Sequence, residues 1–470
     1  MAERLSAREI VALVADDFAE IPYPERQSKP DGPLAWQGYD ASRARAAERT
    51  GEQESVICGT ARIEGTRAVL IAFEFGFLGG SLGERTGDRL EAAYTYAREH
   101  RLPVVPLVAT GGSRMQEGML ALTQLQRVAR QSALTREAGL AQIAVLRDPT
   151  TGGGWATLGA GADVILALPG AQVGFAGSRV RPPDADPSAY TAEAQVAAGA
   201  VDAVVRPEEL RRTLGMWLRL LARRSVSTAD APAEGRTTEA APVPRHPTPH
   251  TEPAPVPAPL GTTGLPATGW DAVRRARSVG RPRAGAYLDA YFTHRAAISG
   301  DRCGGTDPGM LCGFGERGGR TIAYAAQTGT ATRPAGYRTA ARLIRLADRL
   351  GIPVLTLVDT PGAANDAEAE RQGAGVAIAD LFTTVASART PITTLLIGEG
   401  GSGGALALAA PGATYATPDS YFSVIAPELA AAILKRPREE VEATADQLRI
   451  RPQDLAELGV IAHPEGRTLP

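Results

Sequence analysis

The chain has 470 residues, of which 44% are hydrophobic and 22% are charged, so two or three globular domains with full cores are expected. A formal net charge of −2 gives no electrostatic basis for binding nucleic acid or an anionic membrane surface. The three cysteines are far apart or unsuitably spaced, which argues against a disulfide framework and favours a reducing cytoplasm. No apolar run reaches membrane-spanning length, and the N-terminal stretch has no secretory apolar core.

The first half of the chain alternates between predicted strands and predicted helices. Short continuous apolar runs, typical of strands covered on both faces, occur at Ala68–Phe75, Val104–Val108 and Gln142–Leu146. Helical periodicity occupies Asp88–His100 and Met115–Ala138, and Gly139 is placed to end the second helix. This alternation indicates an α/β module.

Residues 227–268 break the pattern, because they are dense in Pro, Ala and Thr and nearly free of large apolar residues. Such a segment cannot bury enough surface to offset its ordering entropy. We predict a disordered Pro-rich tether between an N-terminal module, residues 1–226, and a C-terminal module, residues 269–470. His246 and His250 lie in it; metal binding is one interpretation, but solvated linker residues are expected.

The order of elements recurs after the tether. Strands are predicted at Thr321–Ala326, Pro353–Val358 and Ile392–Ile397. Helices are predicted at Tyr337–Leu350 and Glu368–Thr384, with a further helix starting near Ser402. A closing helical stretch, Arg438–Leu458, is predicted to be interrupted by Pro452.

One sequence pattern occurs twice, 250 residues apart. LPVVPLVATGG at residues 102–112 aligns with IPVLTLVDTPG at residues 352–362, and Gly153-Gly154 falls on Gly403-Gly404 at the same offset. Glycines at strand-to-helix turns let a ligand approach the backbone, and the first free N–H groups of a helix point at negative charge. The duplication therefore predicts two matched active-site halves that act through N–H groups and not through a reactive side chain.

Other catalytic motifs are poorly supported. GxxxxGK[ST] and GxSxG are absent, and no GxGxxG is followed by the acidic residue that a dinucleotide site needs. Ser113 and Ser402 have no convincing His partner. Glu399 lies between glycines after an apolar strand, where helix capping is the simpler interpretation and a direct catalytic role the alternative.

At these turns the chain resembles a known family. KPDGPLAW (29–36), AFEFGFLGGSLGERTGDR (72–89), GGSRMQEG (111–118) and VGFAGSRV (173–180) resemble the β carboxyltransferase subunit of bacterial acetyl-CoA carboxylase. PAGYRTAARLIRLADRLGIPVLTLVDTPGA (334–363), IGEGGSGGALALA (397–409) and YFSVIAPE (421–428) resemble the α subunit. Together these motifs cover nearly everything outside the tether.

The resemblance implies two tandem crotonase-like modules, with the active site at an interface between the N-terminal module of one chain and the C-terminal module of another. It implies that the first module holds an acyl-CoA and that the second holds carboxybiotin on a separate carrier protein. Partners would be that biotin carboxyl carrier protein, a biotin carboxylase and further copies of the chain, as a homodimer or higher oligomer. Nucleic acid and membrane are not expected.

The resemblance also implies the site residues. Gly153 and Gly154 would form the oxyanion hole for the enolate, and Gly403 and Gly404 would line the biotin side. Three groups of residues would contact the substrate: residues of the acyl-CoA pocket, basic residues that bind the CoA phosphates, and residues of the turn after residue 362. They are Gly111, Gly112, Arg114, Lys29, Arg85, Asp366 and Ala367. For Arg114, a helix-start residue in local packing is the alternative interpretation.

Three features depart from the family. The four-cysteine zinc ribbon that usually opens the β subunit is missing, so we predict no zinc. The turn after DTPG reads AAND (363–366), where Asp366 replaces a glycine and a carboxylate would oppose a developing oxyanion. The run that follows is altered to AERQGAG (369–375), and a basic segment is shortened to AAQTGTATRPAGYR (325–338).

These features support a ranked set of functions. The first is the carboxyltransferase component of a biotin-dependent acyl-CoA carboxylase, moving CO2 from carboxybiotin to the α-carbon of an acyl-CoA. The alternative is a biotin-independent decarboxylase of malonyl type, and the third is a non-catalytic scaffold subunit. The AAND turn favours the last two, whereas Gly153-Gly154 argues against the scaffold.

Overall fold

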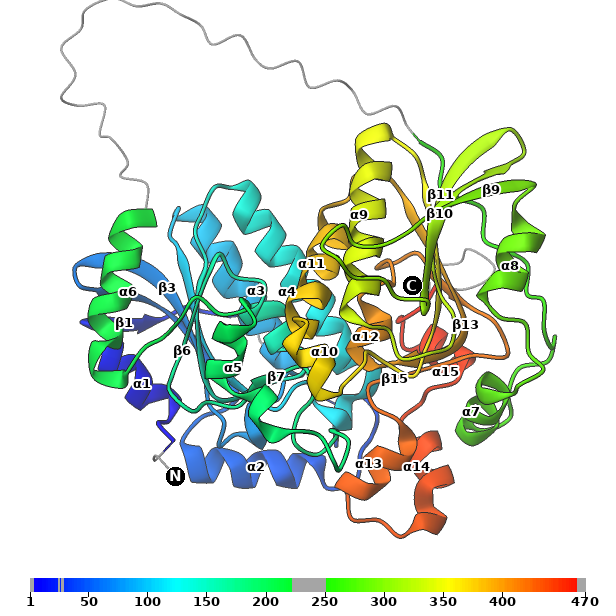
Figure 1. The fold of residues 1–470 in the computed structure, drawn as a ribbon. Coiled ribbons are helices and arrows are strands. Elements are labelled where there is room, and N and C mark those ends of the chain that lie inside the picture. Colours follow the sequence, from blue (N-terminus) through cyan, green and yellow to red (C-terminus); the bar gives the residue numbers. More distant parts are fainter. Residues whose placement is uncertain (1–3, 24–25, 27–28, 222–250, 463–470) are drawn as a thin grey trace, which may run out of the picture.

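The computed structural model describes residues 4–23, 26, 29–221 and 251–462. These residues form two α/β modules side by side, each built around one sheet (Figure 1). We call the described part up to Leu221 the N-module and the part from Thr251 the C-module. None of the described helices is both long enough and apolar enough to cross a membrane.

The N-module sheet has the strand order β1-β2-β3-β4-β5-β6-β8, with β7 pairing β5. The strands are β1 (Asp17–Glu20), β2 (Val56–Ile63), β3 (Thr66–Phe73), β4 (Val104–Thr110), β5 (Ile143–Thr151), β6 (Val164–Ala167), β7 (Val173–Gly174) and β8 (Ala203–Val204). The helices are α1 (Ala7–Val14), α2 (Tyr39–Thr50), α3 (Glu84–Glu99), α4 (Gly118–Glu137), α5 (Ala192–Ala197) and α6 (Pro207–Leu221). Strands β1 to β3 are antiparallel, and from β3 onward the pairs are parallel.

The C-module repeats this plan with the order β14-β13-β12-β11-β10-β9, and β15 pairs β13. Its strands are β9 (His294–Ile298), β10 (Met310–Arg317), β11 (Arg320–Gln327), β12 (Val354–Thr360), β13 (Ile392–Gly401), β14 (Thr414–Ala416) and β15 (Tyr421–Ser423). Its helices are α7 (Gly269–Arg277), α8 (Ala284–Tyr291), α9 (Pro334–Leu350), α10 (Ala367–Arg371), α11 (Ala374–Ser387), α12 (Ser402–Leu406), α13 (Pro427–Ile433), α14 (Val441–Gln447) and α15 (Pro452–Glu457).

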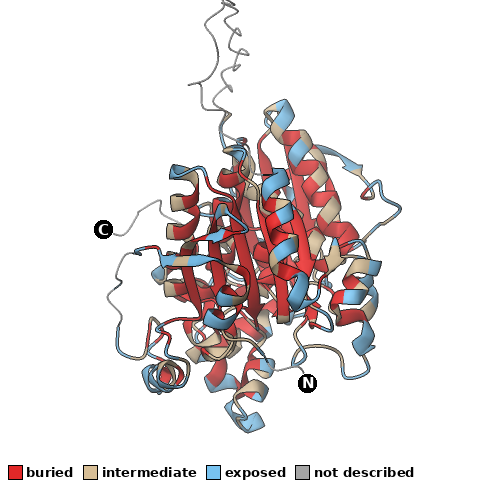
Figure 2. Ribbon diagram, turned by 90° about the vertical axis from the view of Figure 1, so that its left-hand side faces the viewer, coloured by how far each residue is buried: buried red, intermediate tan, exposed pale blue. Residues whose placement is uncertain are grey.

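The six strands and most of the helices predicted from the sequence are confirmed. Central strands β4 and β12 are buried along their whole length, as continuous apolar runs predict, and Figure 2 shows the buried strands beneath partly exposed helices. Gly139 follows α4 with a φ of +71°, a conformation that favours glycine and ends the helix. The register shift between Val108 and Thr110 in β4 recurs between Val358 and Thr360 in β12. The duplication therefore extends to backbone irregularities.

Two helix predictions need correction. The single helix predicted at Glu368–Thr384 is two helices, α10 and α11, because Gly373 lies between them with a φ of +75°. Pro452 does not interrupt a helix but is the first residue of α15. Proline suits that position, since the N–H group it lacks would have no partner within the helix.

The end of the predicted tether also needs correction, whereas residues 227–250 lie outside the described residues. Residues 251–268 pack on the C-module without forming a helix or strand before α7. Ala254 is buried, and its carbonyl accepts a hydrogen bond from Thr393 Oγ1 at 2.8 Å. Thr262 N donates to Asp419 Oδ2 at 2.8 Å. Proline-rich composition does not prevent order here, because the C-module supplies partners for the backbone of this segment.

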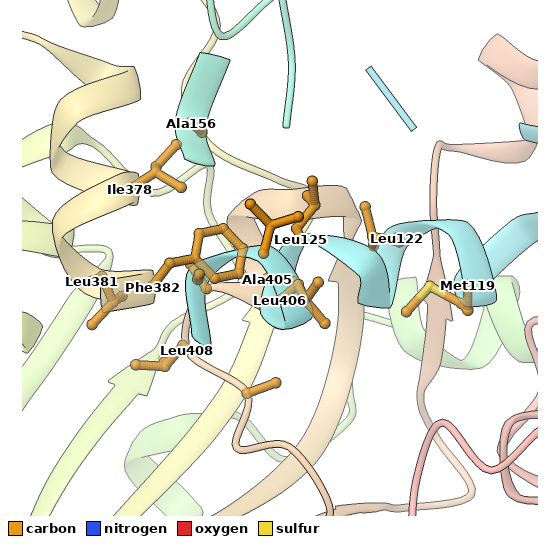
Figure 3. Close-up of a cluster of buried hydrophobic side chains, with 14 of the residues drawn as sticks. Met119, Leu122, Leu125, Ala156, Ile378, Leu381, Phe382, Ala405, Leu406 and Leu408 are labelled. Atoms are coloured by element: carbon orange, nitrogen blue, oxygen red, sulfur yellow. The ribbon is translucent and has the colours of Figure 1, made fainter. Parts of the chain in front are cut away.

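The two modules share a continuous apolar interface. Helix α4 of the N-module packs against α11 and α12 of the C-module, and the short π-helix η3 (Trp155–Gly159) packs against both α4 and α11. Figure 3 shows Leu122 and Leu125 of α4 facing Phe382 of α11 and Leu406 of α12. Burying side chains of this size contributes roughly 1.5–3 kcal/mol each, so the interface belongs to the folding core.

Candidate active site

The first glycine turn joins β5 to η3. Gly152 turns the chain with a φ of +64° and donates its N–H to Gly174 O at 3.2 Å. The next two N–H groups, those of Gly153 and Gly154, donate to no acceptor among the described residues. Unpaired N–H groups at a buried turn are donors held ready for an oxygen atom of a ligand.

The C-module has the matching turn between β13 and α12. Ser402 takes the place of Gly152 and has a φ of +55°, which is uncommon for a residue with a side chain. Gly403 and Gly404 follow in the first turn of α12, and within the described residues no acceptor takes their N–H groups. Gly404 O is held by Tyr337 OH at 3.1 Å and by Gln327 Nε2 at 3.3 Å, which keeps this turn in place.

The two supporting glycines, Gly111 and Gly112, both donate their N–H groups to acceptors within the fold. Gly111 N donates to Gly79 O at 2.9 Å, and Gly112 N donates to Thr110 Oγ1 at 3.0 Å. Their N–H groups are therefore used within the fold and are not available to a substrate. Their contribution is conformational: Gly112 has a φ of +107° and lies beside Gly152.

Sequence reasoning missed two donors at the same turns. Ser113 N and Ala363 N, again 250 residues apart, donate to no acceptor among the described residues. Ser113 forms an isolated bridge with Leu82, and Ala363 forms the equivalent bridge with Thr332. The repeat that relates Gly154 to Gly404 also relates these two residues, so the signal was present in the sequence. Each module thus offers free N–H groups from two adjacent turns.

The glycines are packed so tightly that three of them leave no room for a side chain. A Cβ added to Gly154 would lie 2.2 Å from Thr110 Cγ2, and one added to Gly404 would lie 2.4 Å from Ala363 N. At Gly153 the nearest atom would be Leu125 Cδ1 at 2.5 Å, whereas at Gly403 the same atom would be 3.6 Å away. Both turns therefore pack against one side chain, Leu125, at the interface between the modules.

Arg114 is a structural residue, so the predicted substrate contact is wrong. Its side chain is 1% exposed and pairs with Glu54, which is also 1% exposed. The guanidinium also donates to Ser81 O at 2.7 Å and to Tyr39 OH at 3.2 Å. Burial by itself would raise the pKa of Glu54, but the charge of Arg114 and its hydrogen bonds outweigh burial and lower that pKa to about 2.

The remaining predicted contacts are Lys29, Arg85, Asp366 and Ala367. Lys29 is exposed before α2, and Arg85 is half-buried in the first turn of α3 with its guanidinium 3.4 Å from Arg26 O. Asp366 is the N-cap of α10: its carboxylate accepts from Ala369 N at 2.9 Å and pairs with Arg333 at 3.1 Å. Ala367 is the first residue of that helix.

Asn365, next to Asp366, joins the AAND turn to the N-module. Asn365 Nδ2 donates to Val180 O at 2.8 Å, and Asn365 O accepts from Tyr190 OH at 2.7 Å. The altered turn therefore has a packing role between the modules. Sequence reasoning did not predict it, because the partners lie 175 and 185 residues away.

Comparison with known proteins decides the family. Residues 35–198 match the carboxyl transferase domain, and residues 266–464 match the acetyl co-enzyme A carboxylase carboxyltransferase-like family. The acetyl-coenzyme A carboxylase carboxyl transferase subunits beta/alpha of Saccharopolyspora erythraea are 38% identical over 90% of this chain and 73% of that protein. Those of Salinispora arenicola are 38% identical over 97% of this chain and 81% of that protein.

The chain belongs to this carboxyl transferase family. A probable biotin-dependent acyl-coenzyme A carboxylase beta3 subunit of Mycobacterium bovis is also similar, at 33% identity over 90% of this chain and 82% of that protein. Among solved structures, transcarboxylase 12S is similar at 18% identity and a TM-score of 0.39. The match covers 97% of this chain and 86% of the transcarboxylase chain. The beta subunit of P. aeruginosa geranyl-CoA carboxylase covers 97% and 81% at 21% identity and a TM-score of 0.36.

As a fused carboxyl transferase, the chain carries both kinds of module, and it is an enzyme. The described residues contain no group of three or more His, Cys, Asp or Glu side chains placed to hold a metal ion. The absence of zinc stays a prediction from the sequence.

Proposed function

We propose that this carboxyl transferase moves a carboxyl group from carboxybiotin, carried on a separate protein, to the α-carbon of an acyl-CoA. One observation carries the proposal: two turns related by the internal repeat each offer unpaired backbone N–H groups, at Gly153-Gly154 and at Gly403-Gly404. A reaction that develops negative charge on two oxygens in turn needs two such donor sets.

In the proposed reaction the N-module binds the acyl-CoA. Loss of the α-proton places negative charge on the thioester oxygen, and the N–H groups of Gly153 and Gly154 would stabilise that enolate; one such donor is worth about 3 kcal/mol. The proton would pass to the biotin nitrogen that is freed when the N–C bond of carboxybiotin breaks and releases CO2, so no side chain has to act as the base. The enolate carbon would then form its bond to the carbon of that CO2.

The C-module turn fits the oxygen of a carboxylated urea. The donors of this turn are uncharged backbone N–H groups. Among the described residues no acceptor takes the N–H groups of Gly403, Gly404 or Ala363. Stabilising the charge that develops on a ureido oxygen would make loss of the carboxyl group easier. Asp366 does not have to oppose this, because its carboxylate is committed to the N-cap of α10 and to Arg333.

The organisation of the complex follows from the same proposal. We assign acyl-CoA binding to residues 1–226 and biotin binding to the C-terminal module, to which the described residues 251–268 also belong. A biotin carboxyl carrier protein and a biotin carboxylase would supply the carboxyl group in the cytoplasm. We further propose that the working form is a homodimer or larger homo-oligomer, because the resemblance implies a site between the N-terminal module of one chain and the C-terminal module of another.

A biotin-independent malonyl-CoA-type decarboxylase is the second candidate, and a scaffold subunit is the third. The AAND turn favours the decarboxylase, since Asn365 engages the N-module and leaves less of that turn for biotin. Incubation of purified protein with malonyl-CoA or methylmalonyl-CoA, with and without biotinylated carrier, separates the three. Turnover that requires the carrier supports carboxyl transfer, turnover without it supports the decarboxylase, and no turnover supports the scaffold.

A further inference from the structure

One buried carboxyl group crosses the module interface without a complete set of partners. Glu370 of α10, in the C-module, is wholly buried. Its Oε1 accepts a hydrogen bond from Ala176 N of the N-module at 3.0 Å. Its Oε2 is enclosed and has no partner in the part of the chain that the structure describes.

The segment that Glu370 holds contacts both glycine turns. Gly174, two residues before Ala176, accepts the N–H of Gly152 and pairs with Thr151 at the end of β5. Phe175 lies between them, and a Cβ on Gly403 would be 3.6 Å from Phe175 Cζ. The segment 174–176 therefore supports the N-module turn through its backbone and the C-module turn through its aromatic ring.

Stability alone does not account for a carboxyl group at this place. Burial raises the pKa of Glu370 to about 7, although hydrogen bonds from the backbone of Ala176 and Phe175 lower it. A buried carboxyl with one unpaired oxygen is costly, and an amide or an apolar side chain of similar volume would pack at lower cost. What the carboxyl contributes is a strong acceptor for Ala176 N at the interface.

We propose that Glu370 is a positioning residue for the carboxyl transfer, holding segment 174–176 so that the turn Gly152–Gly154 keeps the conformation in which its N–H groups are presented to the substrate. Glu370 acts through Ala176 and is not placed at the reacting atoms. The inference rests on the proposed function for its effect on catalysis. Its structural part, that Glu370 orders the N-module turn, can be measured without turnover.

Three variants of the full chain test this. Glu370→Ala removes the acceptor, whereas Glu370→Gln keeps an oxygen for Ala176 N. Gln126→Ala is the matched control, because Gln126 Nε2 donates across the same interface to Ala409 O at 2.9 Å without contacting segment 174–176. For each variant, hydrogen exchange of residues 150–154 and 174–176 is measured together with kcat and KM for the acyl-CoA.

The expected result is faster exchange in both segments for Glu370→Ala, with kcat lower by about tenfold or more and KM unchanged, because small displacements of catalytic groups are costly. Glu370→Gln should restore kcat to within about threefold of the wild type, and Gln126→Ala should show neither effect. Unchanged exchange in Glu370→Ala overturns the inference whatever the activity. An equal loss of kcat in Gln126→Ala also overturns it, since that loss would report interface stability.

If Glu370→Ala does not fold, Glu370→Gln and the further variant Glu370→Leu decide. Loss of kcat in folded Glu370→Leu but not in Glu370→Gln supports the inference, and equal kcat in the two overturns it. Absence of turnover in the wild type would refute the proposed function, and the exchange measurement would still decide whether Glu370 orders the turn.

Discussion

Gly403 lies against Leu125, so a glycine of the C-module turn and a helix residue of the N-module meet 278 residues apart. A Cβ on Gly403 would be 3.6 Å from Leu125 Cδ1, an ordinary contact, although Gly153 reaches the same side chain from the other turn. The two glycine turns of one chain therefore pack on either side of one leucine at the interface between its modules.

This packing predicts that alanine destabilises the protein much more at Gly404 than at the neighbouring Gly403. Gly404→Ala should destabilise the protein by about 2 kcal/mol or more, since its Cβ would lie 2.4 Å from Ala363 N, a backbone atom that cannot move aside. Gly403→Ala should change the unfolding free energy by less than about 1 kcal/mol. Denaturant unfolding of both variants measures this, and equal destabilisation would contradict the packing described here.

The loss of stability on substituting Gly154 should come from contact with Thr110 and not from the backbone conformation of the turn. Thr110 Cγ2 would lie 2.2 Å from a Cβ added at Gly154. Gly154→Ala should therefore cost about 2–3 kcal/mol of unfolding free energy. Thr110→Ser removes that methyl group and keeps the oxygen that Gly112 N donates to.

The double variant Gly154→Ala with Thr110→Ser should recover at least about half of that loss. A double-mutant cycle on unfolding free energies gives the coupling directly. Additive effects would show that the strain lies elsewhere. If the rescued variant then loses carboxyl transfer, the loss reports on the Gly154 donor and not on folding.

The pair of Arg114 and Glu54 predicts a stability effect that does not depend on substrate. Glu54→Gln should cost about 3 kcal/mol, because it removes the nearer of the two counter-charges of a buried guanidinium and leaves only Glu117 Oε1 at 3.5 Å. The double variant Glu54→Leu with Arg114→Met should cost much less. If Arg114→Met in that background raised the KM for acyl-CoA more than tenfold, Arg114 would be a substrate contact after all.

The same pair predicts a loss of stability in acid. The pKa of Glu54 is lowered to about 2 in the folded protein, from an ordinary value of 4.5. Its contribution is therefore present above the ordinary pKa and is lost as pH falls from about 4.5 toward 2. Unfolding free energies measured across that range should fall less steeply in the Leu–Met double variant.

For Glu370 we expect the opposite dependence of stability on pH, in the range just below neutral pH. Burial raises its folded pKa from 4.5 to about 7, so the folded state binds the proton more tightly than the unfolded chain. Stability should fall as pH rises from about 4.5 to 7, by on the order of 3 kcal/mol for this group, and change little above that range. Nearby Arg181 moderates the shift and Asp366 adds to it.

Glu370→Gln removes this titration and should flatten the profile of unfolding free energy across the same range. Chemical denaturation at a series of pH values tests it. The same slope in wild type and variant would assign the pH dependence to another group.

The segment 251–268 should be protected despite its prolines. The amide of Thr262 donates to Asp419, and the amide of Leu260 donates to Tyr287 OH at 3.1 Å. Both amides should exchange slowly with solvent in the full chain. Asp419→Ala should release Thr262 selectively, whereas rapid exchange of both amides in the wild type would show that this segment is not packed.

The sequence by itself was sufficient to predict the two modules and the positions of their two glycine turns. Strands such as β4 and β12 are predictable because a continuous apolar run bounded by glycine suits a strand covered on both faces. Gly153 and Gly403 are predictable because an internal repeat places the same turn twice, and the turn is a local property of the backbone.

Only the tertiary structure decided how the residues around those turns are used. Arg114 lies two residues after Gly112 in the sequence, where a substrate contact is expected. In the structure its guanidinium pairs instead with the carboxylate of Glu54, 60 residues earlier. In the sequence Glu370 is one residue of the altered run AERQGAG, yet in the structure its carboxyl accepts a hydrogen bond from Ala176 N of the other module. Proline-rich residues 251–268 are ordered because the C-module covers them. In each case the partner is distant along the chain, and burial changes what a charged or polar group contributes.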